Sequence, residues 1–195
     1  MSLLVVGTVA FDAIETPFGK TDKIIGGAAT YISLAASYFM KEKINLVSVV
    51  GGDFPQSALD MLKNHHVHLD GLQILKDKKT FFWSGRYHND MNTRDTVATE
   101  LNVLGEFDPI LPPAYQDCDF LMLGNLMPAV QRKVISQLKT RPHLIVLDTM
   151  NFWMDTSMEE LKETLAMVDV LTINDSESRQ LSGEYSLVKA AQKIL

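Results

Sequence analysis

The sequence predicts an α/β fold, in which helices cover both faces of a mainly parallel sheet. One observation is a set of short runs, rich in β-branched residues and apolar on both faces, as buried strands are. They are Leu3–Val6, Ile44–Val50, Phe120–Leu123, Leu144–Leu147 and Val168–Ile173. The other is a set of segments with apolar residues at spacings of three and four, the pattern of amphipathic helices. These are Ala28–Met40, Pro55–His66, Ala129–Lys139, Met158–Met167 and Ser176–Leu181, the last stopped by Gly183. Alternating strands and helices imply right-handed βαβ crossovers and parallel pairing.

The composition is that of an ordinary globular domain. Of 195 residues, 46% are hydrophobic and 22% are charged. The net charge of −6 disfavours binding to nucleic-acid phosphates or anionic lipids. No apolar run approaches the roughly 20 residues that span a bilayer. We therefore expect no nucleic-acid partner and no membrane segment. The single cysteine, Cys118, excludes an internal disulfide, and we expect a cytoplasmic protein.

Two segments interrupt the alternation of strands and helices. Phe11–Lys23 is polar with turn residues, and Lys79–Val103 contains a stretch that alternates like a strand solvated on one side. We expect both to form a small separate sheet, a lid that covers a site, with long surface loops as the alternative. Residues 1–195 would then form one domain. The C-terminal helix Ser186–Leu195, with Ser186 as N-cap, has no C-cap, so we expect the fold to continue past it.

Three patterns that suggest other chemistries have simpler explanations. Gly19-Lys20-Thr21 lacks the earlier glycine and the strand–loop–helix context of a phosphate-binding P-loop. His65 and His66 point to different helix faces, so with His68 they predict no metal site. Cys118 lies between two aspartates, which raise the pKa of a thiol and disfavour a nucleophile.

Two glycines and an aspartate near the start of the chain are candidates for a ligand site. Gly26 and Gly27 directly precede a predicted helix, so backbone N–H groups at its N-terminus can approach a polar ligand closely. Asp12 follows the first strand, and open parallel sheets bind ligands outside the carboxyl ends of their strands. Its carboxylate would accept hydrogen bonds from ligand hydroxyls. The alternatives are close helix–sheet packing for the glycines and a turn cap for Asp12.

Asn174 and Glu177 follow another predicted strand and open a helix. A capping box explains the pair structurally. The functional alternative is an amide and a carboxylate that hold a hydrated Mg²⁺ near phosphates. Asp148 ends a strand at the same sheet edge, and we interpret it as a substrate-side or structural residue.

Together these residues resemble the PfkB/ribokinase family of carbohydrate and nucleoside kinases, in order along the whole chain. The matching segments are Gly7–Asp12, Gly26–Ala29, Gly51–Asp53, Gly124–Leu126 and Asn174–Glu177. The first looks like the family's first strand with its substrate-binding aspartate. The second is similar to its di-glycine signature, and the last matches its N-x-x-E motif, whose glutamate helps to organise Mg²⁺ and phosphate.

The resemblance implies a ribokinase-like, Rossmann-like three-layer α/β/α sandwich with a small β lid. It also implies ATP-dependent phosphoryl transfer to a hydroxymethyl group of a sugar or nucleoside. Asp12, Gly26 and Gly27 would hold this acceptor. Asn174 and Glu177 would organise the ATP and Mg²⁺ cofactors, with Glu177 as the metal ligand.

Three further residues are predicted to contact the substrate. Tyr31 stands where the family often has a sugar-binding asparagine. Arg86 and Arg94 rest on no family motif, but guanidinium groups on a lid suit anionic or polyhydroxyl substrates. Surface arginines are the alternative. We also expect a homodimer through the lid, which is common in the family, with solvated edge strands as the alternative.

The family's Gly-Ala-Gly-Asp signature, whose aspartate is the catalytic base, has no counterpart here, nor does the C-terminal region that holds the adenine. The chain resembles roughly the N-terminal two-thirds of the family's members. We therefore expect no catalytic residue and no turnover from these residues alone. The alternative function is a non-catalytic module that binds a sugar or nucleoside. A dinucleotide-binding enzyme is disfavoured, because no G-x-G-x-x-G follows Leu3–Val6.

Overall fold

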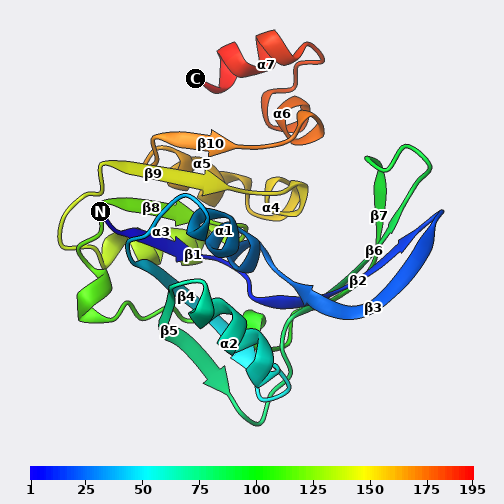
Figure 1. Ribbon diagram of the computed structural model, residues 1–195. Helices are drawn as coiled ribbons and strands as arrows, with labels where there is room; N and C mark the ends of the chain where they lie inside the picture. Colours follow the sequence, from blue (N-terminus) through cyan, green and yellow to red (C-terminus); the bar gives the residue numbers. More distant parts are fainter.

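Six parallel strands form the central sheet, in the order β10-β9-β8-β1-β4-β5 (Figure 1). The computed structural model describes all of residues 1–195. The strands are β1 (Leu3–Val6), β4 (Ile44–Gly51), β5 (Val67–Leu75), β8 (Phe120–Leu123), β9 (Leu144–Asp148) and β10 (Val170–Thr172). The helices are α1 (Ala28–Ser37), α2 (Gln56–Asn64), α3 (Pro128–Ser136), α4 (Asn151–Thr156), α5 (Met158–Leu165), α6 (Asp175–Ser182) and α7 (Leu187–Ile194), with 3₁₀ turns at Asn102–Glu106 and Pro113–Tyr115. The predicted α/β fold with a parallel sheet is confirmed.

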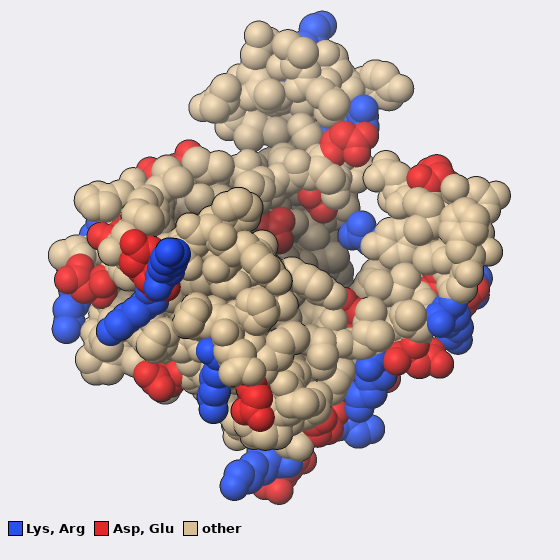
Figure 2. All heavy atoms as spheres, in the orientation of Figure 1, with Lys and Arg blue, Asp and Glu red and all other residues tan.

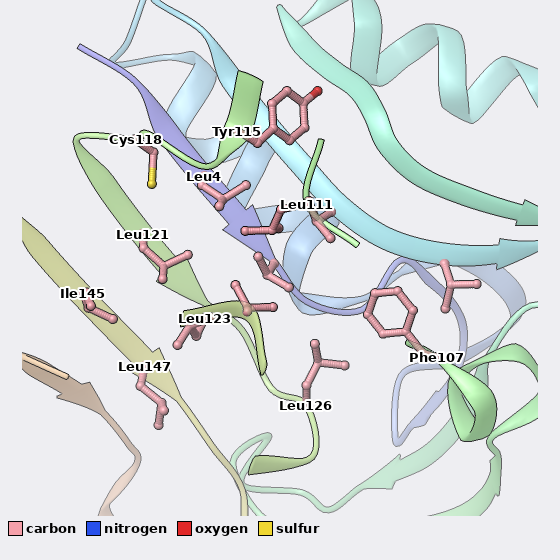
Figure 3. Packing of buried hydrophobic residues seen from close by; sticks show 14 of the residues in the cluster. Leu4, Phe107, Leu111, Tyr115, Cys118, Leu121, Leu123, Leu126, Ile145 and Leu147 are labelled. Carbon is pink, nitrogen blue, oxygen red and sulfur yellow. The ribbon is translucent and has the colours of Figure 1, made fainter. Parts of the chain in front are cut away.

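The core lies on both faces of this sheet, because alternate residues of each strand point to opposite sides. In β1, Leu4 and Val6 belong to a cluster that includes residues of α3 and α5, whereas Val5 packs with residues of α1 and α2. Figure 3 shows the first cluster, in which Leu121 of β8 lies between Leu4 of β1 and Ile145 of β9. The result is the expected three-layer sandwich. None of its helices is long and apolar enough to cross a membrane.

Three details of the sequence prediction were wrong. The strand predicted as buried over Val168–Ile173 is the shorter β10 at the edge of the sheet, where Val170 is 39% exposed. α1 ends at Ser37, so Phe39 is exposed rather than packed on the core. Ser186 occupies the N-cap position of α7, but its side chain forms no capping hydrogen bond. Gly183, by contrast, ends α6 in the left-handed conformation, as predicted.

A second, four-stranded sheet projects from the carboxyl edge of the first (Figure 1). Its order is β3 (Gly19–Gly26), β2 (Ala10–Thr16), β6 (Phe82–Tyr87) and β7 (Arg94–Glu100). β2 pairs in parallel with β6, and the two outer pairs are antiparallel. The two segments that interrupt the α/β alternation therefore form a separate sheet, which we call the lid sheet.

Candidate functional site

Gly26 and Gly27 lie directly against the Asp12 carboxylate. A Cβ atom on Gly26 would lie 2.2 Å from Asp12 Oδ2, so only glycine leaves room for this carboxylate at its present position. Burial raises the pKa of Asp12, and a hydrogen bond from the backbone N–H of Gly27 partly offsets that effect. Asp12, Gly26 and Gly27 thus form one cluster, as predicted.

The start of α1 is bound to the end of β1. Gly27 is the N-cap, with φ of 95°, and a Cβ atom there would lie 2.3 Å from the carbonyl oxygen of Thr8. Thr8 accepts two hydrogen bonds: Oγ1 from the N–H of Ala28 at 2.9 Å, and its carbonyl from the N–H of Ala29 at 2.9 Å. These N–H groups, expected to approach a ligand, are bonded within the protein. The glycines therefore position Asp12 and the helix.

A polar cavity of about 450 Å³ opens at the carboxyl ends of β9 and β10. Its lining residues come from the ends of three strands and the loops that follow them, from α6 and from the lid sheet: Arg94, Asn125, Asp148, Thr149, Met150, Thr172, Ile173, Asn174 and Glu177. Figure 2 shows a hollow between the main body and the lid sheet, with acidic side chains on its floor and a basic side chain on the lid side. Asn174, Glu177 and Arg94, predicted separately, therefore share one cavity.

Two carboxylates face this cavity. Burial, and after it the charge of Glu177, raises the pKa of Asp148 to about 6, although backbone N–H groups of Asn125 and Thr149 hydrogen-bond to it. Asn174 and Glu177 form a complete capping box. The Glu177 N–H donates to Asn174 Oδ1 at 2.9 Å, and the Asn174 N–H donates to Glu177 Oε2 at 2.9 Å. Glu177 therefore caps α6 and also lines the cavity.

The register of the lid sheet separates the two candidate arginines. Cross-strand partners share a face of a sheet. Arg94 is the partner of Tyr87, and Trp83 is the partner of Asp12. Tyr87 and Trp83 lie on the same face of β6, so Arg94 and Asp12 share a face of the lid sheet. Arg94 thus faces the cavity. Arg86 lies on the opposite face, where its Nε is 2.9 Å from Glu15 Oε1. Of the five arginines, Arg94 alone forms no ion pair.

Tyr31 is also outside this cavity. Its hydroxyl donates to the carbonyl oxygen of Ile25 at 3.0 Å, and 57% of the residue is exposed. A substrate contact from Tyr31 or Arg86 would therefore need a rearrangement of hydrogen bonds or ion pairs that are already formed.

Sequence reasoning missed part of the cavity wall. Thr149, buried and with an unpartnered Oγ1, lines the cavity. Gln131 Nε2 donates to the carbonyl oxygens of Gly124 and Asp148, and so ties the ends of β8 and β9 together. Thr149 directly follows β9, so its place at a strand end was a usable signal. No local pattern marks Gln131, which lies in the middle of α3.

Comparison with known proteins places this geometry in a family. The model of the pfkB family carbohydrate kinases matches residues 2–195. The chain belongs to the PfkB family of carbohydrate kinases. This confirms the resemblance, and the ribokinase-like fold is confirmed by solved structures of that family.

Several proteins that are similar to this chain are nucleoside or sugar kinases. A cytidine kinase of Thermococcus kodakarensis is 27% identical over 199 residues, which cover 100% of this chain and 69% of the relative. A nucleoside kinase of Methanocaldococcus jannaschii, 18% identical, matches with a TM-score of 0.73 over 98% of this chain and 67% of its own. A ribokinase of Cryptococcus neoformans in complex with ADP is 18% identical and matches with a TM-score of 0.75 over 98% of this chain and 65% of its own. The chain therefore spans about two thirds of the length of these relatives.

Asp148→Asn should stabilise the protein at neutral pH. Because the Asp148 pKa is raised from 3.8 to about 6, the stabilisation by its neutral carboxyl group is fully present below about pH 4 and is lost as the pH rises through 6. After allowance for partial exposure, the cost at pH 7.5 is about 1–2 kcal/mol. Urea unfolding with EDTA should show the variant more stable by this amount at pH 7.5 and equal at pH 4. An equal difference at both pH values would contradict the assignment.

Proposed function

We propose that residues 1–195 form the acceptor-binding and metal-binding part of an ATP-dependent kinase that phosphorylates a hydroxymethyl group of a sugar or nucleoside. The observation that carries the proposal is the arrangement at one sheet edge: two carboxylates and an arginine without an ion pair line one cavity. The names of the relatives, a cytidine kinase and a ribokinase, support the reaction class.

Magnesium fits the carboxylates of this cavity. Mg²⁺ keeps several water ligands and takes one or two carboxylates beside substrate phosphates. Asp148 and Glu177 supply such a pair, and the charge of Glu177 already disfavours ionisation of Asp148. No group of three or more His, Cys, Asp or Glu side chains is arranged to hold a metal without a substrate. When bound, the ion would neutralise phosphate charge.

The chain's own residues would orient the two reactants. Asp12, held between Gly26 and the N–H of Gly27, would accept hydrogen bonds from acceptor hydroxyls. Arg94, whose guanidinium has no carboxylate partner, would bind phosphoryl oxygens from the lid side. Phosphoryl transfer depends mainly on such positioning and charge neutralisation.

Residues 1–195 by themselves should show no kinase turnover. The reaction needs a group that accepts the proton of the attacking hydroxyl and donors that stabilise the transferring phosphoryl group. The sequence contains no Gly-Ala-Gly-Asp segment to supply them. ADP release measured with Mg-ATP and a panel of sugars and nucleosides should stay at background. Turnover by these residues alone would overturn this prediction, and its loss in Asp148→Asn with Mg²⁺ binding retained would make Asp148 the base. Ligand binding without turnover, even after fusion to the C-terminal third of the cytidine kinase relative, would favour the non-catalytic binding module.

Glu177→Gln should remove the stabilisation of the fold by Mg²⁺ while leaving its basal stability nearly unchanged. Glutamine can accept the hydrogen bond from the Asn174 N–H, so the capping box survives and only the charge is lost. The melting temperature of the wild type should rise with Mg²⁺ and phosphate, and that of the variant should not. Asp175→Asn is the matched control, because Asp175 lies on the same helix and pairs with Arg179 instead. A lower basal melting temperature with an unchanged Mg²⁺ response would show that Glu177 serves only as a cap.

A further inference from the structure

We propose that the indole of Trp83 is a stacking platform for the flat base of a nucleoside, which makes a nucleoside, rather than a free sugar, the acceptor. This inference rests on the proposed function and names its substrate class.

Trp83 lies directly beside the predicted acceptor anchor. In the parallel pair of β2 and β6, Trp83 is the cross-strand partner of Asp12, so both side chains project from the same face of the lid sheet. Arg94 projects from that face as well and lines the cavity. The indole therefore lies on the face of the lid sheet that overlooks the site.

The indole of Trp83 is held beside Gly85 of the same strand. Gly85 is buried, and a Cβ atom there would lie 2.0 Å from Trp83 Cη2, 2.5 Å from Cζ2 and 2.8 Å from Cζ3. The six-membered ring therefore fills the space that a side chain at position 85 would need. Trp83 Nε1 also donates to Thr96 Oγ1 at 3.3 Å, which orients the indole within the sheet. Gly85 and Thr96 thus fix the position of the indole on the lid sheet.

The spacing suits a ligand of two rings. Gly85 lies two residues beyond Trp83, so the indole is displaced along the sheet from Asp12 by about 6–7 Å, the rise of two strand residues. The ring of a sugar held by Asp12 would lie too far from the indole to contact it, whereas a base attached to that sugar would reach the indole. Every nucleobase has a π-face that stacks on an aromatic side chain. The Arg94 guanidinium carbon lies over the same ring, 5.8 Å from its centre, as in a cation–π contact.

The test compares nucleosides with ribose. Calorimetry should show that Trp83→Leu weakens cytidine and inosine binding at least tenfold and leaves ribose binding unchanged, while Trp83→Phe retains most of the affinity. Gly85→Ala keeps the indole but displaces it, and should cause the same selective loss. Tyr38→Leu, which removes the aromatic ring of a residue that is 77% exposed just after α1, is the control that should change nothing.

The outcomes separate this inference from the function on which it rests. Nucleosides that bind Trp83→Leu as well as the wild type would overturn the platform and leave the kinase proposal intact. An equal loss of ribose and nucleoside binding would also overturn it, because Trp83 would then shape the lid and not contact a base. If neither ribose nor any nucleoside binds the wild type, both proposals fail.

Discussion

Gly27→Ala should destabilise the protein by about 3 kcal/mol or more. The residue has φ of 95°, where an L-amino acid is strained by roughly 1–3 kcal/mol. The new Cβ would also lie 2.3 Å from the carbonyl oxygen of Thr8 and 2.9 Å from the nitrogen of Ala10. Both atoms belong to the backbone, so no side-chain rotation relieves the overlap, and overpacking of this kind typically costs a further 1–3 kcal/mol. Urea unfolding followed by circular dichroism measures the change.

Gly19→Ala is the matched control for this substitution. No atom lies within 4 Å of a Cβ built on Gly19, and its φ is not positive. Its stability should change by no more than about 0.5 kcal/mol. A Gly27→Ala variant as stable as Gly19→Ala would show that the junction of β1 and α1 is not packed as described.

Asp12→Ala and Gly26→Ala should each weaken acceptor binding by 30-fold or more, with little loss of stability. Removal of Asp12 deletes a charged hydrogen-bond acceptor, worth about 2 kcal/mol or more to a bound hydroxyl. Alanine at Gly26 would lie 2.2 Å from Asp12 Oδ2, and the carboxylate would have to rotate away from its present position. Because its nearest neighbours are atoms of a rotatable side chain, Gly26→Ala should retain the stability that Gly27→Ala loses. Calorimetric titration with cytidine, inosine and ribose measures both affinities.

The double variant shows whether the glycine acts through the aspartate. If Gly26 serves only to make room for Asp12, alanine at position 26 should cost nothing further once Asp12 is already alanine. Additive losses would mean that Gly26 contacts the ligand by itself. If Asp12→Ala binds the acceptor as tightly as the wild type does, Asp12 serves only as a turn residue.

The central sheet was predictable because its strands are apolar on both faces. β4 is buried at all eight positions, as a run that is apolar on both faces, such as Ile44–Val50, requires in an α/β domain. No bounds were predicted for β5, because the polar residues His68, Asp70 and Gln73 interrupt its apolar ones. The exposure of β10 could not be predicted, since a strand's place at the edge of a sheet depends on its neighbours and not on its own residues.

Sequence motifs predicted the residues of the candidate site, but not the face of the sheet on which each side chain lies. Asp12, the di-glycine and Glu177 follow strand ends or open helices, positions that the sequence marks locally. Arg86 and Arg94 have similar local settings, and the sequence offered no reason to prefer one. Which of them faces the cavity depends on strand pairing, and the pairing contains an irregularity between Ser84 and Gly85. One residue of slip moves a side chain to the other face of a sheet.

The most direct test of this account is a crystal structure of the protein with cytidine 5′-monophosphate and Mn²⁺, a substitute for Mg²⁺ with a strong anomalous signal. We expect the ribose hydroxyls at Asp12, the 5′-phosphate near Arg94 and the anomalous peak between Asp148 and Glu177. A nucleotide bound elsewhere, for example in the second cavity between Val50 and Lys76, with no metal at the two carboxylates, would contradict the proposed site.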